Sequence, residues 1–179
     1  LNVIELYKHV QQGEELPSEV TEAQYKAVKQ TPENYCAWYI GLVSIGCSFG
    51  GKEWGGYARS TEADGSPVNF AARAKKKLLG MNFSEIHLTT CNYPEVSIDR
   101  NCIVYCDPPY AGTTGYKTKF DSVAFWKWAE GAATVADVYV SEYSAPPGWE
   151  AIWEKETASL AGKASVGKRA TEKLFRFIK

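Results

Sequence analysis

Residues 107–110 carry the side chains in this chain that are best suited to chemistry, and they read Asp107, Pro108, Pro109 and Tyr110. They follow Ile-Val-Tyr at 103–105, a run of β-forming residues that predicts a short buried strand. Because proline has no N–H group and fixes its own φ, the strand must end at the two prolines. A carboxylate, two carbonyl groups and an aromatic ring are therefore expected at the carboxyl end of a strand, where open α/β sheets bind ligands.

A flat ring with an exocyclic amine would suit this group of residues. Tyr110 can stack on the ring, while Asp107 and the carbonyl next to Pro108 accept the two amine hydrogens, which makes the nitrogen more nucleophilic. Adenine and cytosine are common rings of this kind, and inside a duplex either must first be flipped out at a cost of a few kcal/mol. Stacking on one aromatic side chain returns about 1–3 kcal/mol per base. Tyr110 alone could thus offset much of the cost of flipping.

An ordinary Pro-Pro turn is the alternative interpretation, with Asp107 as a turn former and Tyr110 as a half-buried plug. Pro-Pro turns are common, but Asp-Pro-Pro-Tyr directly after a β-branched run is much rarer by chance. We therefore favour the interpretation as an amine-binding site.

The motif Asp107-Pro108-Pro109-Tyr110 resembles the catalytic motif of the amino-methyltransferases that act on DNA, and Asp in first place is typical of the adenine-N6 enzymes. Most of the chain resembles the DNA adenine methylase family of bacteria and phages. The resembling segments are a helix at 3–8, a phage-type target-recognition segment at 48–59, residues 91–93, a strand and loop at 140–146 and a closing hairpin at 168–175.

This resemblance implies a Rossmann-like, S-adenosylmethionine-dependent methyltransferase sheet, incomplete at its N-terminal side, with an inserted and mainly helical target-recognition region. Residues 1–13 would begin the catalytic domain, 14–80 would form the target-recognition region and 81–179 the rest of the catalytic domain. The implied enzyme transfers a methyl group from S-adenosylmethionine to the N6 amine of a flipped adenine in double-stranded DNA, for restriction-modification or a related purpose.

The resemblance also assigns roles to single residues. The implied catalytic residues are Asp107, Pro108, Pro109 and Tyr110, and those beside the cofactor are Asn92, Tyr93 and Asp107. The implied DNA contacts are Phe49, Lys52, Trp54, Tyr57, Arg59, Lys117 and Lys119.

The chain departs from the family at two places. Asn92 stands where an acidic residue usually binds the cofactor's adenine, although its side-chain carbonyl can still accept from an amine. The Phe-x-Gly-x-Gly loop that cradles the cofactor's methionine part has no counterpart, and the chain begins at Leu1, beyond that loop. We therefore expect the larger C-terminal part of an enzyme, with a separate N-terminal fragment carrying the loop as a partner. A non-catalytic DNA-binding remnant, one half of a split enzyme and a truncated chain stay open, as do cytosine-N4 and protein-glutamine methylation.

Composition indicates a folded protein: hydrophobic residues make up 45% and aromatic residues 13% of the 179 residues, which is ample for a packed core. Five cysteines, an odd number without metal-like spacing, indicate free thiols in a reducing compartment and no metal site. No apolar run approaches the length of a membrane span, and no signal peptide is visible. We expect a cytoplasmic protein of a bacterial or phage-infected cell, without a membrane partner.

The net charge is −1, but basic residues gather in two segments. Residues 50–80 carry six basic and three acidic side chains, and residues 160–179 carry six basic and one acidic. Both segments could face DNA phosphates, or they could be ordinary solvated surfaces. Charge alone leaves the two interpretations about even.

Periodicity predicts helices at 2–12, 21–29, 33–46, 69–79 and 121–133, and strands at 86–90, 102–106, 137–142, 151–156 and 173–178. Thr21 with Gln24 resembles a capping box. Asn69 is the expected cap of the helix that ends at 79, and Asp121 or Ser122 that of the helix that ends at 133. The glycine-rich stretch 47–60 predicts a loop or hairpin. Residues 111–120 predict a loop that could close over a flipped base. Because strands and helices alternate after residue 80, the pattern favours an α/β sheet.

Overall fold

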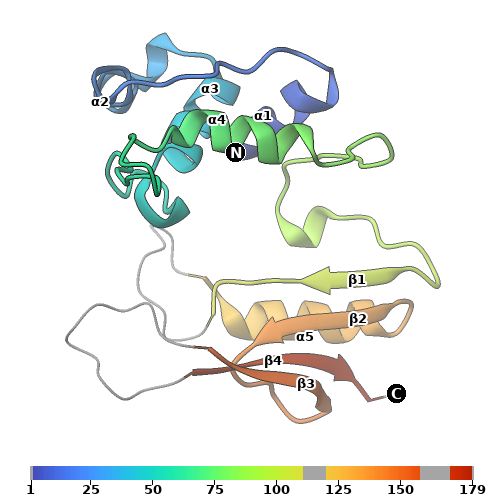
Figure 1. The fold of residues 1–179 in the computed structure, drawn as a ribbon. Helices are drawn as coiled ribbons and strands as arrows, with labels where there is room; N and C mark the ends of the chain where they lie inside the picture. The colour runs from blue at the N-terminus through green and yellow to red at the C-terminus, as the bar shows by residue number, and fades with distance from the viewer. Residues whose placement is uncertain (1, 111–119, 158–169, 179) are drawn as a thin grey trace. The chain divides into compact units, whose positions relative to one another are not determined.

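A computed structural model describes residues 2–110, 120–157 and 170–178 of the chain. The fold is mixed α/β and divides into two compact units, Leu1–Cys91 and Asn92–Lys179 (Figure 1). The first unit is helical, and the second contains the sheet. The functional boundaries expected after residues 13 and 80 stay predictions, although the helix at the start of the chain packs within the first unit.

The first unit contains four of the five α-helices in the described residues. They are α1 (Asn2–Gln11), α2 (Glu22–Gln30), α3 (Ala37–Gly41) and α4 (Phe70–Leu79), with a π-helical turn at Leu42–Gly46 and 3-10 turns at Pro32–Asn34 and Phe49–Gly51. The expected capping box of Thr21 and Gln24 is present at α2, and the Asn69 side chain accepts from the backbone N–H of Ala72 at α4. Local sequence therefore determined where these two helices begin.

The continuous helix predicted at 33–46 is wrong. Tyr35 and Cys36 both have extended backbone, with ψ of 151° and 142°, so helical hydrogen bonds cannot run through them. A short turn therefore precedes α3, which begins at Ala37. A Cβ on Gly41 would lie 2.4 Å from the backbone oxygen of Asn2, so only glycine lets α3 approach α1 this closely.

The strand predicted at 86–90 is also wrong, because these residues have no regular structure. A strand needs a neighbouring strand, and none of the strands in the described residues lies in the first unit. The Gln11 side chain instead donates from Nε2 to the backbone oxygens of Phe83 and Ile86, each at 2.7 Å. A side chain thus takes over part of the hydrogen bonding that a sheet would have supplied.

A four-stranded mixed sheet forms the second unit, in the order β1-β2-β4-β3 (Figure 1). Its strands are β1 (Ile103–Cys106), β2 (Asp137–Glu142), β3 (Trp149–Thr157) and β4 (Ala170–Phe177). The strands predicted at 102–106 and 137–142 are confirmed within a residue, and the later two begin two and three residues before their predicted starts at 151 and 173. The burial predicted for the first strand is wrong, because β1 lies at the edge of the sheet and Ile103 and Tyr105 are exposed. The Rossmann-like detail of the sheet stays a proposal.

Helix α5 (Ser122–Ala133) connects the parallel strands β1 and β2 and covers one face of the sheet. The expected cap is confirmed, because the Asp121 carboxylate accepts from the backbone N–H of Ala124 at 3.0 Å. The core of this unit consists of buried side chains from α5 and from strands β2, β3 and β4: Phe125, Trp126, Ala129, Val138, Val140, Trp149 and Phe175. Burial of these groups holds α5 on the sheet.

Strand directions bring three chain segments to one edge of this sheet. Strands β1 and β2 are parallel, so their carboxyl ends meet at the same edge, while the antiparallel β4 begins there. In register, Cys106 of β1 pairs with Val140, and Glu142 at the end of β2 pairs with Lys173. Side chains after β1, at the end of β2 and at the start of β4 are therefore neighbours in space.

In the described residues, no helix is long and apolar enough to cross a membrane.

Candidate functional site

The four residues of the motif lie directly after β1, at the carboxyl end that the sequence predicted. Asp107 is exposed, and Pro108, Pro109 and Tyr110 are half-buried. Strand β1 ends at Cys106, because the following prolines cannot donate to the sheet. The motif is thus held by a short strand whose partner β2 lies in the middle of the core.

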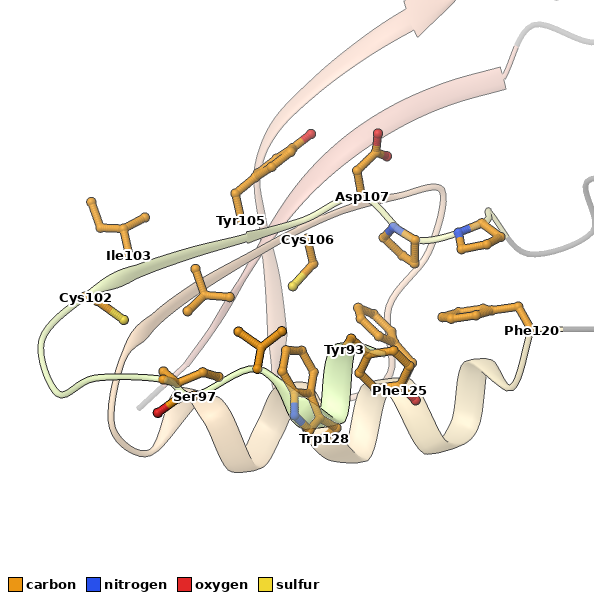
Figure 2. Close-up of a pocket in the computed structure, with 15 residues that line it drawn as sticks. Tyr93, Ser97, Cys102, Ile103, Tyr105, Cys106, Asp107, Phe120, Phe125 and Trp128 are labelled. Carbon is orange, nitrogen blue, oxygen red and sulfur yellow. The ribbon is translucent and has the colours of Figure 1, made fainter. Parts of the chain in front are cut away.

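Alternation along β1 sends its side chains to opposite sides of the strand. Ile103, Tyr105 and Asp107 point to one side, and Cys102 and Cys106 point to the other (Figure 2). The second side is the side of α5. The Asp107 carboxylate therefore lies on the sheet face opposite α5. Alternation along a strand predicts that Asp107 shares a face with Tyr105, but the pairing of β1 with β2 decides which face this is.

A pocket of about 580 Å³ lies along β1 and the first residues of the motif. Asp107, Pro108 and Pro109 line one part of it, and Tyr93 lines another. Aromatic side chains contribute much of the remaining wall, namely Phe120, Phe125 and Trp128. The volume falls within the range of about 300–1,000 Å³ that small-molecule sites occupy.

The aromatic wall is one cluster centred on Tyr93. Its ring centroid lies 5.5 Å from that of Phe125 and 5.0 Å from that of Trp128, both in nearly perpendicular arrangements. Our sequence interpretation missed Phe120, Phe125 and Trp128 as pocket residues. The signal was available, since Phe125 and Trp128 are three apart on a predicted helix and therefore share one face.

Cys106 also lies in this pocket, but its environment indicates packing rather than reactivity. Burial raises the pKa of its thiol to about 11, so the thiol is neutral near pH 7. The same holds for Cys47 in the first unit, where burial raises the pKa to about 11. This agrees with the expected role of most cysteines as core residues.

Tyr110 belongs to a polar cluster rather than to the wall of the pocket. Its hydroxyl donates to Oε1 of Glu172 at 2.6 Å and also hydrogen-bonds the Ser141 hydroxyl. The Tyr143 ring meets the Tyr110 ring at 84°, with centroids 4.8 Å apart. Burial, the bond to Glu172 and the nearby charge of Asp107 raise the pKa of the Tyr110 phenol above its usual value. The phenol is therefore a neutral donor.

Three strands contribute to this cluster, as the sheet edge requires. Ser141 is buried near the end of β2, and Glu172 lies near the start of β4. Ser141 pairs with Leu174, so Glu172, two residues earlier, shares the sheet face of Ser141. Ser141 and Glu172 were not predicted as site residues. Ser141 directly follows the run Val-Tyr-Val at 138–140, and a polar residue at the end of such a predicted strand was the one signal for Ser141.

Asn92 and Tyr93 are neighbours in the chain, but only Tyr93 lines the pocket. Tyr93 lines the same pocket as Asp107, as the resemblance implied for a cofactor site. Asn92 is exposed, does not line the pocket, and its amide donates to the carboxylate of Glu95 at 2.9 Å. Of the three expected cofactor neighbours, Tyr93 and Asp107 therefore line the pocket and Asn92 does not.

The expected DNA contacts at 48–59 divide into inward-facing and outward-facing residues. Trp54 and Tyr57 pack at the edge of a core cluster, with ring centroids 5.5 Å and 5.7 Å from that of Tyr25. Phe49 is 70% exposed, and Lys52 is exposed. Arg59 is exposed but forms an ion pair with Glu22 at 2.7 Å. Phe49 and Lys52 are thus the two members best placed to meet a partner, while Lys117 and Lys119 lie outside the described residues.

The cofactor implied by the resemblance, S-adenosylmethionine, can be tested against this pocket. Aromatic walls suit an adenine ring, and Asp107 and Pro108 line one end of the pocket, where the Asp107 carboxylate points to the sheet face opposite α5. No glycine of the described residues lines the pocket, so a backbone cradle is not part of it there. The aromatic residues of the lining are of a kind that could hold the adenosyl part of the cofactor.

Searches of protein-family models and of curated proteins found no match for this chain.

Proposed function

We propose that this chain is the base-binding part of a DNA adenine-N6 methyltransferase that uses S-adenosylmethionine. The observation that carries the proposal is the position of Asp107-Pro108-Pro109-Tyr110 at the carboxyl end of β1, beside an aromatic pocket. The mixed sheet supports it further, because β4 pairs with both β2 and β3, as the closing hairpin inferred for residues 168–175 would require.

Each residue of the motif has a task in this proposal. The Asp107 carboxylate and the carbonyl next to Pro108 would accept the hydrogens of the adenine amine and hold its nitrogen toward the methyl donor. The Tyr110 ring would stack on the flipped base. Tyr93, Phe120, Phe125 and Trp128 would surround the cofactor and exclude water. The bound cofactor would supply an electrophilic methyl group, so the chain itself acts mainly by positioning.

Substitutions of the motif give the direct test. Asp107→Ala removes an acceptor for the amine, and Tyr110→Ala removes the stacking ring. In a complete enzyme, with the segment that carries the glycine loop present, we expect each to abolish transfer of tritiated methyl groups from S-adenosylmethionine to unmethylated double-stranded DNA. Asp99→Ala is the matched control, since Asp99 is an exposed carboxylate of the same unit. Unchanged incorporation in Asp107→Ala and Tyr110→Ala would refute the assignment.

A non-catalytic DNA-binding protein is the second candidate, and the glycine-rich segment favours it. Phe49 and Lys52 are exposed there, while Gly50 and Gly51 adopt φ of 65° and 67° and so allow the turn that exposes them. Lys76 and Lys77 add exposed positive charge on α4 of the same unit. Calorimetry separates the candidates: specific binding of S-adenosylmethionine supports the enzyme, whereas DNA binding without cofactor binding supports the second candidate.

A further inference from the structure

Ser141 and Glu172 have no role in the function proposed above, although both bond the hydroxyl of a residue that does. The Tyr110 hydroxyl donates to Glu172 at 2.6 Å and bonds the Ser141 hydroxyl. Ser141 Oγ also lies 3.4 Å from the same Glu172 oxygen. The two hydroxyls carry one proton each, so with Tyr110 donating to Glu172 the Ser141 hydroxyl donates to Tyr110, and the 3.4 Å between Ser141 and Glu172 is a close contact beside these two bonds.

These two bonds tie the end of the motif to two other strands. Tyr110 follows β1, Ser141 lies in β2 and Glu172 in β4. Ser141 is only 5% exposed, so its hydroxyl has little freedom, and β4 is held between β2 and β3. The Tyr143 ring, at 84° to that of Tyr110, contacts the same side chain. Residues of the sheet thus hold the Tyr110 side chain at its hydroxyl.

A stacking ring works best when its orientation is set before the base arrives. A free tyrosine side chain loses rotamer freedom on binding, and this loss of entropy weakens the interaction. Hydrogen bonds from a rigid scaffold remove this loss in advance. These hydrogen bonds engage only the hydroxyl of Tyr110, so they do not cover the π-face of its ring.

From these contacts we infer that Ser141 and Glu172 are positioning residues, which hold the Tyr110 ring in the orientation for stacking on the target base. The inference rests on the proposed function for the identity of the base. Glu172 accepts the hydrogen bond of the Tyr110 hydroxyl, and Ser141 donates to that hydroxyl from β2.

A double-mutant cycle tests the inference with the full chain. Tyr110→Phe keeps the ring and removes the hydroxyl, and Glu172→Ala removes the acceptor. We expect each to lower kcat/KM for methyl transfer to unmethylated DNA by about tenfold, the usual order for a bond to a charged group. The double variant should be no worse than either single variant. Glu172→Gln retains an acceptor and should rescue most of the loss, and Glu150→Ala, an exposed carboxylate of the same sheet, is the control.

Nuclear magnetic resonance of ¹³Cζ-labelled tyrosine provides a readout that does not depend on activity. The Tyr110 signal is assigned by its loss in Tyr110→Phe. In Glu172→Ala it should titrate at a lower pH than in the unsubstituted chain, because an acceptor that stabilises the neutral phenol is gone. Glu172→Gln and Tyr110→Phe preserve side-chain volume, so they report on the bond even where Glu172→Ala folds poorly.

The outcomes distinguish this inference from the proposed function. If the unsubstituted chain transfers methyl groups but the losses in the two single variants add, the positioning role is overturned and the function stands. If the Tyr110 titration is unchanged in Glu172→Ala, then Glu172 does not hold the Tyr110 hydroxyl and the inference is overturned. If no methyl group is transferred even when the segment with the glycine loop is supplied, although the Tyr110 titration changes as expected, the hydrogen bonds to Tyr110 stand but the proposed function and the stacking role fall together.

Discussion

The Tyr110 hydroxyl bonds Ser141 and Glu172, whereas its ring contacts Tyr143. The sequence alone did not predict these contacts. The sequence predicted that the residues at 107–110 form one group after a strand, because these four residues are consecutive in the chain. The partners Ser141 and Glu172 are more than thirty residues away in the chain. Their contact with Tyr110 depends on the pairing of β2 with β4, which no local pattern specifies.

The raised pKa of Tyr110 leads to a prediction about pH and stability. Burial and the bond to Glu172 keep the phenol neutral in the folded chain, whereas the unfolded chain ionises at about pH 10. The resulting stabilisation is present below about pH 10 and is lost as the pH rises above that value. We therefore expect the difference in free energy of unfolding between the unsubstituted chain and Tyr110→Phe to narrow above pH 10.

Urea unfolding between pH 8 and 11 measures this difference. The pH dependence should become weaker in Glu172→Ala, because that change removes one cause of the raised pKa. A difference between the chain and Tyr110→Phe that stays constant over the whole range would contradict the prediction.

At the scale of elements, the caps and the apolar strands were predictable, and tertiary contacts decided the rest. Asp121 and Asn69 cap helices as expected, since a side chain three residues from its backbone donor acts locally. The strand expected at 86–90 fails because no described strand of its unit can pair with it. The helix expected at 33–46 breaks where Tyr35 is extended. Periodicity describes which residues could share a face, but not whether a partner is present.

Helix α5 gives the prediction at this scale, because it carries Phe125 and Trp128 to the pocket. The Asp121 carboxylate accepts from the Ala124 N–H at 3.0 Å, and loss of such a cap costs about 1 kcal/mol. We expect Asp121→Ala to lower the free energy of unfolding by this amount and Asp121→Asn to restore most of it. Urea unfolding followed by tryptophan fluorescence is the measurement.

Asp99→Ala serves again as the control, because Asp99 is exposed and lies outside the helix. Equal losses of stability in Asp121→Ala and Asp99→Ala would show that the cap contributes nothing specific to α5.

For the whole molecule, the proposed tasks fall on different units. Phe49 and Lys52 belong to the helical unit, and Asp107, Tyr110 and the aromatic pocket belong to the sheet unit. DNA contact and cofactor contact should therefore be separable by substitution. The sequence did not suggest this division, because the expected DNA contacts included Lys117 and Lys119 as well as the segment 48–59, and one basic segment lies in each unit.

We expect Phe49→Ala to weaken DNA binding by roughly tenfold, since stacking of one aromatic is worth about 1–3 kcal/mol. Lys52→Ala should lower the slope of log K against log salt by about 1, as for one lost phosphate contact. Binding of S-adenosylmethionine should stay unchanged in both. Fluorescence anisotropy with duplex DNA and calorimetry with the cofactor measure the two effects.

Leu79→Ala is the control for these variants, because Leu79 is 56% exposed in the same unit. Weaker cofactor binding in Phe49→Ala, or equal loss of DNA binding in Leu79→Ala, would speak against separate tasks for the two units.

The sequence by itself determined the motif at 107–110, the strand before it and the caps of three helices, because each depends on residues close together in the chain. Only the tertiary structure decided the surroundings of that motif. Strand register sent Asp107 to the face opposite α5, and packing turned Trp54 and Tyr57 inward. Pairing of β2 with β4 brought Ser141 and Glu172 to Tyr110. These outcomes depend on which distant surfaces bury one another, and that information is spread over the whole chain.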